Sequence, residues 1–220
     1  MVIFQNNKHI FWQALVFTII IFSLGLLFGY FLESYRADRS GLVALNSEIN
    51  LLDEQIRAEL LKSTDVNCEL AKASIFSFAD KIYDEALQLE DYSQSSKFSS
   101  ESLKTIHKKY DLLRVMLWNE GIELKKKCGD FHTVVYFFDY SSEDSETKAR
   151  QSYFSRMLSD LKGAHSSDVL LIPIASNLDL GSVNLMTEFY KVKSPSILID
   201  ESKVIEDVVT LEHLESFLVS

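Results

Sequence analysis

The chain has 220 residues, enough for a membrane anchor, a connecting segment and about one globular domain. It contains only 7 Gly and 2 Pro, a composition that argues against long disordered tails. The formal net charge of −10 argues against nucleic-acid binding, because phosphate recognition requires a basic surface. The same charge argues against a body that lies flat on anionic lipid.

One long apolar segment, residues 10–32, contains no charged side chain. At about 1.5 Å per residue it reaches roughly 34 Å, enough to cross a hydrocarbon core of about 30 Å. Trp12 and Tyr30 lie near its two ends, where amphipathic rings favour the membrane interface. A cleaved signal peptide is the alternative, but cleavage at Ser23–Gly25 would fall inside the apolar run. The sequence therefore predicts a single-pass membrane protein with a short tail, residues 1–9.

The anchor gives no clear orientation, because Lys8 precedes it and Arg36 and Arg39 follow it. It does contain Gly25 and Gly29, and this G-x-x-x-G spacing lets two helix backbones approach closely. The spacing indicates either a homodimer or simply two small residues in a lipid-facing helix.

Residues 33–130 are expected to form a helical spacer. After an expected break at Ser40–Gly41, apolar residues alternate by three and four over about two heptads, at Leu42, Leu45, Ile49, Leu52 and Ile56. This seam either pairs two chains as a short coiled coil or packs on the helices that follow. Because it is out of phase with Gly25 and Gly29, one straight helix cannot serve both contacts.

Two amphipathic helices are predicted at residues 66–91 and 101–128, and the polar turn between them favours an antiparallel hairpin. Cys68 and Cys128 are expected on the inward stripes, close together at the open end of this hairpin. This placement predicts a disulfide and an oxidising compartment, which favours an extracytoplasmic body. The alternative is two buried free thiols.

Residues 131–220 read as an α/β domain with the order β-α-β-α-β-β-α, whose first half is a parallel β-α-β unit. The strands are expected near residues 132–138, 168–175, 196–200 and 203–208, with a turn at Glu201–Ser202. Thr210 is expected to cap a final helix. The fold class is therefore mixed: a transmembrane helix, a helical spacer and a C-terminal α/β domain.

The segment from Leu185 to Asp200, with Tyr190, Val192 and Pro195, resembles the helix, Tyr-x-Val and cis-proline strand of the thioredoxin family. The resemblance covers about 90 residues, 131–220. It implies that the Ser194–Pro195 peptide bond is cis, a feature that persists only where the structure selects it. It also implies a peptide-binding edge at Ser194 and Pro195, since redox-active relatives meet an extended substrate there.

The chain departs from the family where thioredoxins carry C-x-x-C, just after the first core strand. Ser142 and Ser145 stand at these positions, and serine hydroxyls cannot exchange disulfides. The acidic neighbours Glu143 and Asp144 would also raise the pKa of a nearby thiol. The domain is therefore expected to be redox-inactive.

No catalytic, cofactor-binding or metal-binding residues are expected, because the five histidines are scattered and no nucleotide or hydrolase motif occurs. The leading interpretation is a non-enzymatic, membrane-tethered interaction module that binds a protein or peptide by strand addition beside Pro195. One alternative is a component of an envelope thiol–disulfide pathway that uses Cys68 and Cys128. The other is a purely structural, dimeric membrane scaffold. The expected partners are the lipid bilayer, a protein or peptide and a second copy, and not nucleic acid.

Overall fold

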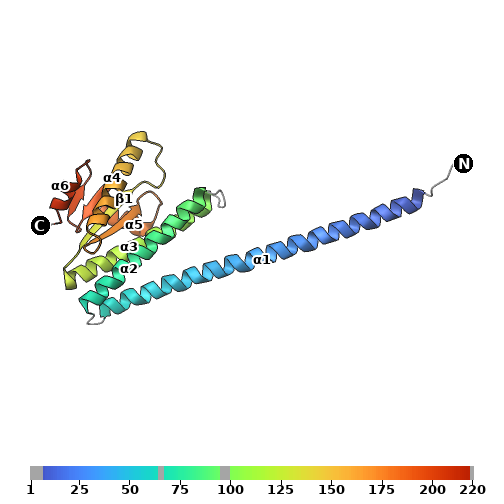
Figure 1. Ribbon diagram of the computed structural model, residues 1–220, viewed down its shortest axis with the longest axis horizontal. Helices are drawn as coiled ribbons and strands as arrows, with labels where there is room; N and C mark the ends of the chain where they lie inside the picture. Colours follow the sequence, from blue (N-terminus) through green and yellow to red (C-terminus); the bar gives the residue numbers. More distant parts are fainter. Residues whose placement is uncertain (1–6, 64–66, 95–99, 219–220) are drawn as a thin grey trace. The chain divides into compact units, whose positions relative to one another are not determined.

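The computed structural model describes residues 7–63, 67–94 and 100–218. Most of the predicted N-terminal tail, residues 1–6, and most of the predicted polar turn, residues 95–99, lie outside the described residues. Contacts divide the chain into two compact units between Ile56 and Arg57. Each unit is described by itself (Figure 1).

The N-terminal unit consists of helix α1, Asn7–Ser63, which continues for a few residues into the second unit. Its 57 residues extend about 86 Å at 1.5 Å per residue. The expected break at Ser40–Gly41 is wrong, because the helix runs through both residues. A single interior glycine costs only about 1 kcal/mol relative to alanine, and α1 contains no proline to remove a hydrogen-bond donor.

The apolar part of α1, Phe11–Leu32, is a 22-residue segment that is long and apolar enough to cross a membrane. All of its side chains are exposed, and a Cβ added at Gly25 or Gly29 would meet no atom within 4 Å. Most of the predicted seam falls in residues 33–51, whose side chains lie outside the described residues; Leu52 and Ile56 are exposed.

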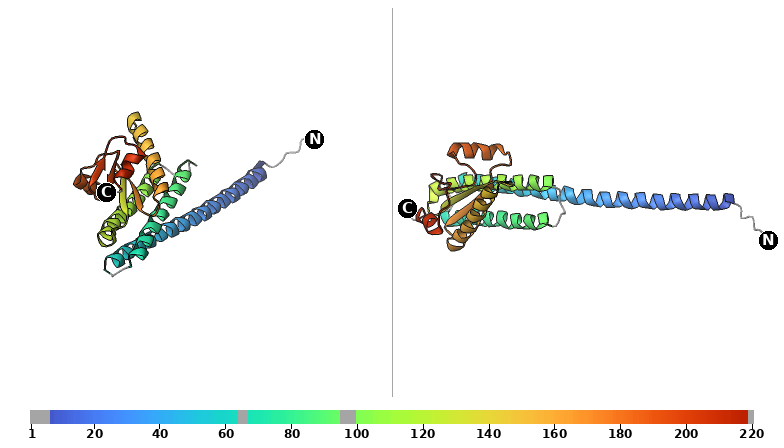
Figure 2. Two further views of the ribbon diagram at one scale, coloured as in Figure 1. Left: turned by 60° about the vertical axis from the view of Figure 1, so that its left-hand side comes forward. Right: turned by 90° about the horizontal axis from the view of Figure 1, so that it is seen from above.

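The C-terminal unit begins with a helical hairpin of α2, Cys68–Gln94, and α3, Ser100–Cys128 (Figures 1 and 2). The two helices pack along the predicted apolar stripes, whose buried members include Ala71, Ile75, Phe78, Ile82, Tyr110, Leu113 and Leu117. A second stripe of α3, turned by roughly a quarter of the helix circumference, is buried against the sheet. Its members are Asp111, Arg114, Trp118 and Gly121.

A four-stranded sheet follows, with the strand order β2-β1-β3-β4. Its strands are β1, His132–Phe138; β2, Val169–Ala175; β3, Ser196–Ile199; and β4, Lys203–Ile205. Strand β1 is parallel to β2 and antiparallel to β3, and β3 and β4 form a hairpin. Three helices connect or follow the strands: α4, Ser145–Ala164; α5, Gly181–Tyr190; and α6, Leu211–Ser216. The order of elements is the predicted one, and Thr210 caps α6 as expected.

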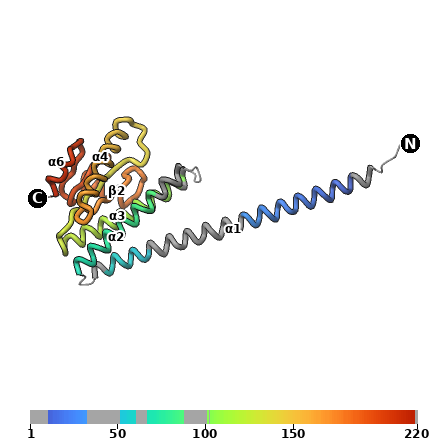
Figure 3. Tube along the Cα trace, viewed as in Figure 1, coloured from blue at the N-terminus to red at the C-terminus, as the bar shows by residue number. Residues whose placement is uncertain are grey.

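Helices cover both faces of the sheet. On one face, α4 and α6 bury a cluster that includes Phe154, Leu158, Leu161 and Leu214 against Val134 and Ile197. On the other face, the Trp118 ring of α3 lies 5.9 Å from Phe137 of β1 and 5.3 Å from Tyr190 of α5. The predicted boundary at residue 131 therefore does not separate two compact units: the hairpin is a layer of the same unit as the sheet, as the Cα trace shows (Figure 3).

Candidate functional site

The loop that follows β1 contains Ser142 and leads directly into α4, where the second serine of the expected C-x-x-C position is found. Ser145 is the first residue of α4, and Asp144 is its N-cap. The Asp144 carboxylate accepts a hydrogen bond of 2.7 Å from the main-chain N–H of Thr147. The Ser142 hydroxyl accepts one of 3.3 Å from the main-chain N–H of Asp144. Both serines are thus part of the turn that starts the helix.

Asp144 also determines the electrostatics at the N-terminus of α4. Hydrogen bonds from Thr147 lower the pKa of the Asp144 carboxyl, so the group is ionised at neutral pH. Its negative charge lies where the helix dipole is positive. A thiolate at the same terminus would meet this carboxylate, whereas thiol chemistry needs an electropositive environment. The Asp144 carboxylate therefore makes the start of α4 an unfavourable environment for a thiolate.

Pro195 lies at the same end of the sheet as this loop. Ser196, which follows it, pairs with Phe137 near the end of β1. The Ser194–Pro195 peptide bond is cis, as the resemblance implies. The start of α4 and the segment before β3 therefore lie at the same end of the sheet.

The main chain just before Pro195 is available for pairing. Lys193 is exposed and Ser194 is half-buried. Among the described residues, none hydrogen-bonds to the main-chain N–H or C=O of Lys193 or Ser194. Unpaired main-chain groups next to a sheet are a template for another extended segment. This short segment is the candidate binding edge.

Helix α3 supports the neighbouring loops through polar residues that the sequence interpretation missed. The main-chain N–H of Tyr140 donates to the Asn177 side chain at 2.7 Å, which joins the loops after β1 and β2. The His107 ring of α3 lies 4.5 Å from the Tyr140 ring. Burial, followed by the positive charge of Arg114, lowers the pKa of His107. Contacts with α3 therefore stabilise the loops at this end of the sheet.

Asp111 is the most deeply buried carboxyl of this cluster, with 1% of its surface exposed. It accepts a hydrogen bond of 3.0 Å from Arg114. Burial raises the pKa of Asp111 to about 6, although Arg114 and the main chain of Ala175 oppose the shift. The spacing of Asp111, Arg114, Trp118 and Gly121 is the signal that could have indicated a second buried face of α3.

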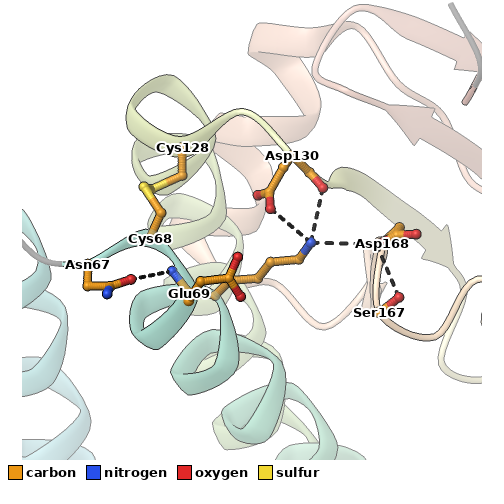
Figure 4. A network of polar contacts seen from close by, with 8 residues as sticks. Asn67, Cys68, Glu69, Cys128, Asp130, Ser167 and Asp168 are labelled. Atoms are coloured by element: carbon orange, nitrogen blue, oxygen red, sulfur yellow. Dashed lines mark hydrogen bonds and ion pairs between the residues drawn. A yellow bond between two sulfur atoms is a disulfide. The ribbon is translucent and has the colours of Figure 1, made fainter.

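The disulfide lies at the opposite end of the sheet, where α3 leads into β1. Cys68 and Cys128 are joined by a bond of 2.00 Å with a Cα–Cα distance of 5.6 Å (Figure 4). The expectation that both lie on the inward stripes is wrong for Cys68, which is exposed, while Cys128 is half-buried. The reason is that Cys68 is the first residue of α2, one turn before the helix starts to bury its stripe.

One lysine of α2 ties this end of the hairpin to the sheet (Figure 4). The Lys72 ammonium donates to the main-chain and side-chain oxygens of Asp130, at 3.1 Å each. It also lies 3.5 Å from the carboxylate of Asp168, just before β2. The disulfide therefore joins the two helices of the hairpin to each other, and Lys72 links the hairpin to the residues that precede β1 and β2.

The turn between β3 and β4 belongs to the same end of the molecule. Its central residues are Asp200 and Glu201, one position earlier than expected, with positive φ angles of 49° and 56°. Glu201 accepts hydrogen bonds from Trp118 at 2.8 Å and Thr133 at 2.7 Å. Burial opposes the ionisation of Asp200, but hydrogen bonds from Lys125, His132 and Thr133 leave its pKa lowered. These contacts stabilise a left-handed turn that lacks glycine.

Across the part of the chain that the structure describes, no three His, Cys, Asp or Glu side chains are grouped so that they could hold a metal ion. No family model, curated protein or solved structure matches this chain.

Proposed function

We propose that this chain is a membrane-anchored, redox-inactive, thioredoxin-like protein whose C-terminal unit binds an extended segment of another protein. Three features support the thioredoxin-like interpretation. The parallel β1-α4-β2 unit is followed by an antiparallel β3-β4 hairpin. The Ser194–Pro195 bond precedes β3 in the cis form. Helix α4 begins at Ser145, directly after the loop from β1.

The unpaired main chain of Lys193 and Ser194 is the observation that carries the binding proposal. An extended segment that lies beside these residues gains main-chain hydrogen bonds, and neighbouring side chains supply specificity. The stretch is short, so the partner adds a few hydrogen bonds rather than a full strand.

The absence of thiol chemistry at this edge follows from the residues that surround it. Ser142 and Ser145 replace the reactive cysteines, and Asp144 places a negative charge at the start of α4. The two cysteines of the chain are bonded to each other at the opposite end of the sheet. The edge therefore holds its partner without forming a covalent bond.

The apolar segment and the disulfide support a membrane-attached, extracytoplasmic location for the C-terminal unit. The Phe11–Leu32 segment of α1 crosses the bilayer, and the C-terminal unit stands in water. Because disulfides persist in oxidising compartments, the unit faces the extracytoplasmic side.

Photocrosslinking of the full-length protein in intact cells tests the proposal. A benzophenone side chain at Lys193 is expected to capture a protein partner, whereas the same group at Lys148, an exposed residue of α4, is not. Ser194→Pro removes the main-chain donor and is expected to abolish the crosslink, while Ser194→Ala keeps the donor and the crosslink. Equal capture at both positions, or full capture by Ser194→Pro, would reject the binding edge.

A second candidate function is thiol–disulfide exchange, which the exposure of Cys68 favours. A partner dithiol would be oxidised to its disulfide, and Cys68 and Cys128 would take up its two electrons and two protons. Equilibration of the native protein with redox buffers separates the candidates. A reduction potential below about −300 mV indicates a structural bond, and a higher value supports exchange.

A further inference from the structure

We infer that the segment bound beside Pro195 carries a carboxylate and a large apolar side chain. This inference rests on the proposed function and specifies the chemistry of the partner. Helix α5 and the residues after it form the surface around the unpaired main chain of Lys193 and Ser194, and the inference is drawn from that surface.

Helix α5 presents an apolar pair to solvent. Leu185 is 66% exposed and Phe189 is 73% exposed, the highest value for a large apolar side chain among the described residues of the C-terminal unit. They are four residues apart, so they lie on one side of the helix. The opposite side is occupied, because Val183 is buried and the Tyr190 ring contacts Trp118. The Phe189 ring touches the Tyr190 ring, with centroids 4.9 Å apart, but most of the surface of Phe189 and Leu185 faces solvent.

Two lysines lie between this pair and Pro195. Lys191 and Lys193 are exposed and flank the buried Val192. Among the described residues neither forms an ion pair, whereas Lys72, Lys125 and Lys126 all lie against carboxylates. The exposed Glu188 offsets one of the two charges, and the chain as a whole has a net charge of −10. A net positive spot on an acidic protein attracts a carboxylate and gives the contact its selectivity.

The chain conformation keeps these groups together. Lys191 adopts a left-handed conformation with φ of 55°, which reverses the chain at the end of α5. The main-chain N–H of Val192 then donates to the carbonyl of Thr187 at 3.0 Å. This bond holds the segment before Pro195 against the last turn of α5. A peptide that pairs with Lys193 and Ser194 therefore runs past the lysines and the exposed apolar side chains.

An anionic bilayer is the other surface that a Leu, Phe and Lys set could meet. The unpaired main chain favours a peptide, because lipid headgroups gain little from a strand-like row of donors and acceptors, whereas an extended peptide satisfies both. The bilayer is accordingly an outcome of the test below.

Binding of blocked eight-residue peptides to the full-length protein in detergent micelles tests the inference by fluorescence anisotropy. The reference peptide alternates valine and aspartate around a central phenylalanine. A second peptide has lysine in place of aspartate, and a third has serine in place of phenylalanine. The reference peptide is expected to bind about tenfold more tightly than either of the others.

Two double variants identify the residues responsible. Lys191→Glu with Lys193→Glu is expected to reverse the preference between the aspartate and lysine peptides. Leu185→Ser with Phe189→Ser is expected to remove the preference for phenylalanine. The matched control, Lys104→Glu with Lys148→Glu, makes the same charge change at exposed positions of α3 and α4 and should leave the preferences unchanged.

The outcomes distinguish this inference from the proposed function. If all three peptides bind equally and Ser194→Pro abolishes their binding, the binding edge stands and the partner chemistry is rejected. If no peptide binds but vesicles of phosphatidylcholine with phosphatidylglycerol do, and the lysine variant stops that binding, the occupant is a bilayer and the inference fails. If nothing binds, both proposals fail.

Discussion

The two units of this chain differ in where their apolar side chains lie. Every side chain of the Phe11–Leu32 segment is exposed, and no tertiary contact is needed for the segment to be a helix, since its backbone bonds are internal. In the C-terminal unit most of the large apolar residues of β1 and β2 are fully buried, and α3 is covered on two sides. The helical structure of the first unit therefore follows from its composition. The fold of the second unit depends on the tertiary contacts between its helices and strands.

The largest expected effect is on the anchor. Ile20→Asp with Leu24→Asp places two carboxylates near the middle of the apolar segment, at a cost of about 5–7 kcal/mol for membrane insertion. The double variant should be lost from the membrane fraction after an alkaline wash. Leu70→Asp with Leu112→Asp, at exposed positions of the C-terminal unit, should stay with the membrane. Full retention of the first variant would show that the segment does not span a bilayer.

The second effect belongs to the C-terminal unit alone. Cys68→Ser with Cys128→Ser opens a loop with a sequence separation of 60. By the chain-entropy relation this lowers the free energy of unfolding by about 4 kcal/mol. Urea denaturation followed by circular dichroism measures the change, and membrane retention of the variant should equal that of the parent. A loss below about 1 kcal/mol would mean that the unfolded chain is already restricted without the bond, and the chain-entropy account would be wrong here.

The sequence was sufficient where the signals are local. The charge-free apolar run predicted a helix long and apolar enough to cross a membrane, and the three-and-four spacing predicted both helices of the hairpin. The two cysteines then followed from the hairpin geometry, because antiparallel helices bring their open ends together. The alternation of strands and helices predicted the order of the C-terminal elements, and the resemblance of the segment around Pro195 to thioredoxins implied the cis bond.

The sequence was insufficient where a residue's role depends on tertiary contacts. The sequence pattern assigned no packing role to Trp118 or Asp111, and both face the sheet. Ser40–Gly41 read as a break, but a single glycine costs only about 1 kcal/mol relative to alanine, which is too little to end this helix. The turn at Asp200 and Glu201 requires hydrogen bonds from distant residues such as Trp118, so no local turn rule predicts it.

The third effect is a pH dependence confined to the C-terminal unit. Because burial raises the pKa of Asp111 to about 6 from 3.8, the folded state holds this proton more tightly than the unfolded state. The contribution of protonated Asp111 to the free energy of unfolding is complete below the unfolded pKa of 3.8. It is lost as the pH rises through about 6. The loss is about 3 kcal/mol. Urea midpoints measured between pH 4 and pH 8 should show this decline.

Asp111→Asn is the variant that isolates this group. It leaves Arg114 without its carboxylate and so lowers stability at every pH, but it should flatten the decline between pH 4 and pH 6. Asp84→Asn, at an exposed position of α2, should leave the curve unchanged. An unaltered slope in Asp111→Asn would assign the pH dependence to other groups.

The smallest effect tests the close approach of α3 to the sheet, which has no counterpart in the apolar segment of α1. A Cβ at Gly121 would lie 3.0 Å from the Leu170 side chain and 3.3 Å from the Thr133 methyl group. Gly121→Val adds two further methyl groups at this contact and should lower the free energy of unfolding by about 2 kcal/mol through overpacking.

Gly163→Ala in α4 is the matched control, because a Cβ there meets no atom within 4 Å and alanine favours the helix. Gly25→Val should leave the unfolding of the C-terminal unit unchanged, since that glycine lies in the other unit and has open space around it. If Gly121→Val were as stable as the parent, α3 would not be held against the sheet at this distance. The burial of α3 on two sides, which distinguishes the C-terminal unit, would then not hold at Gly121.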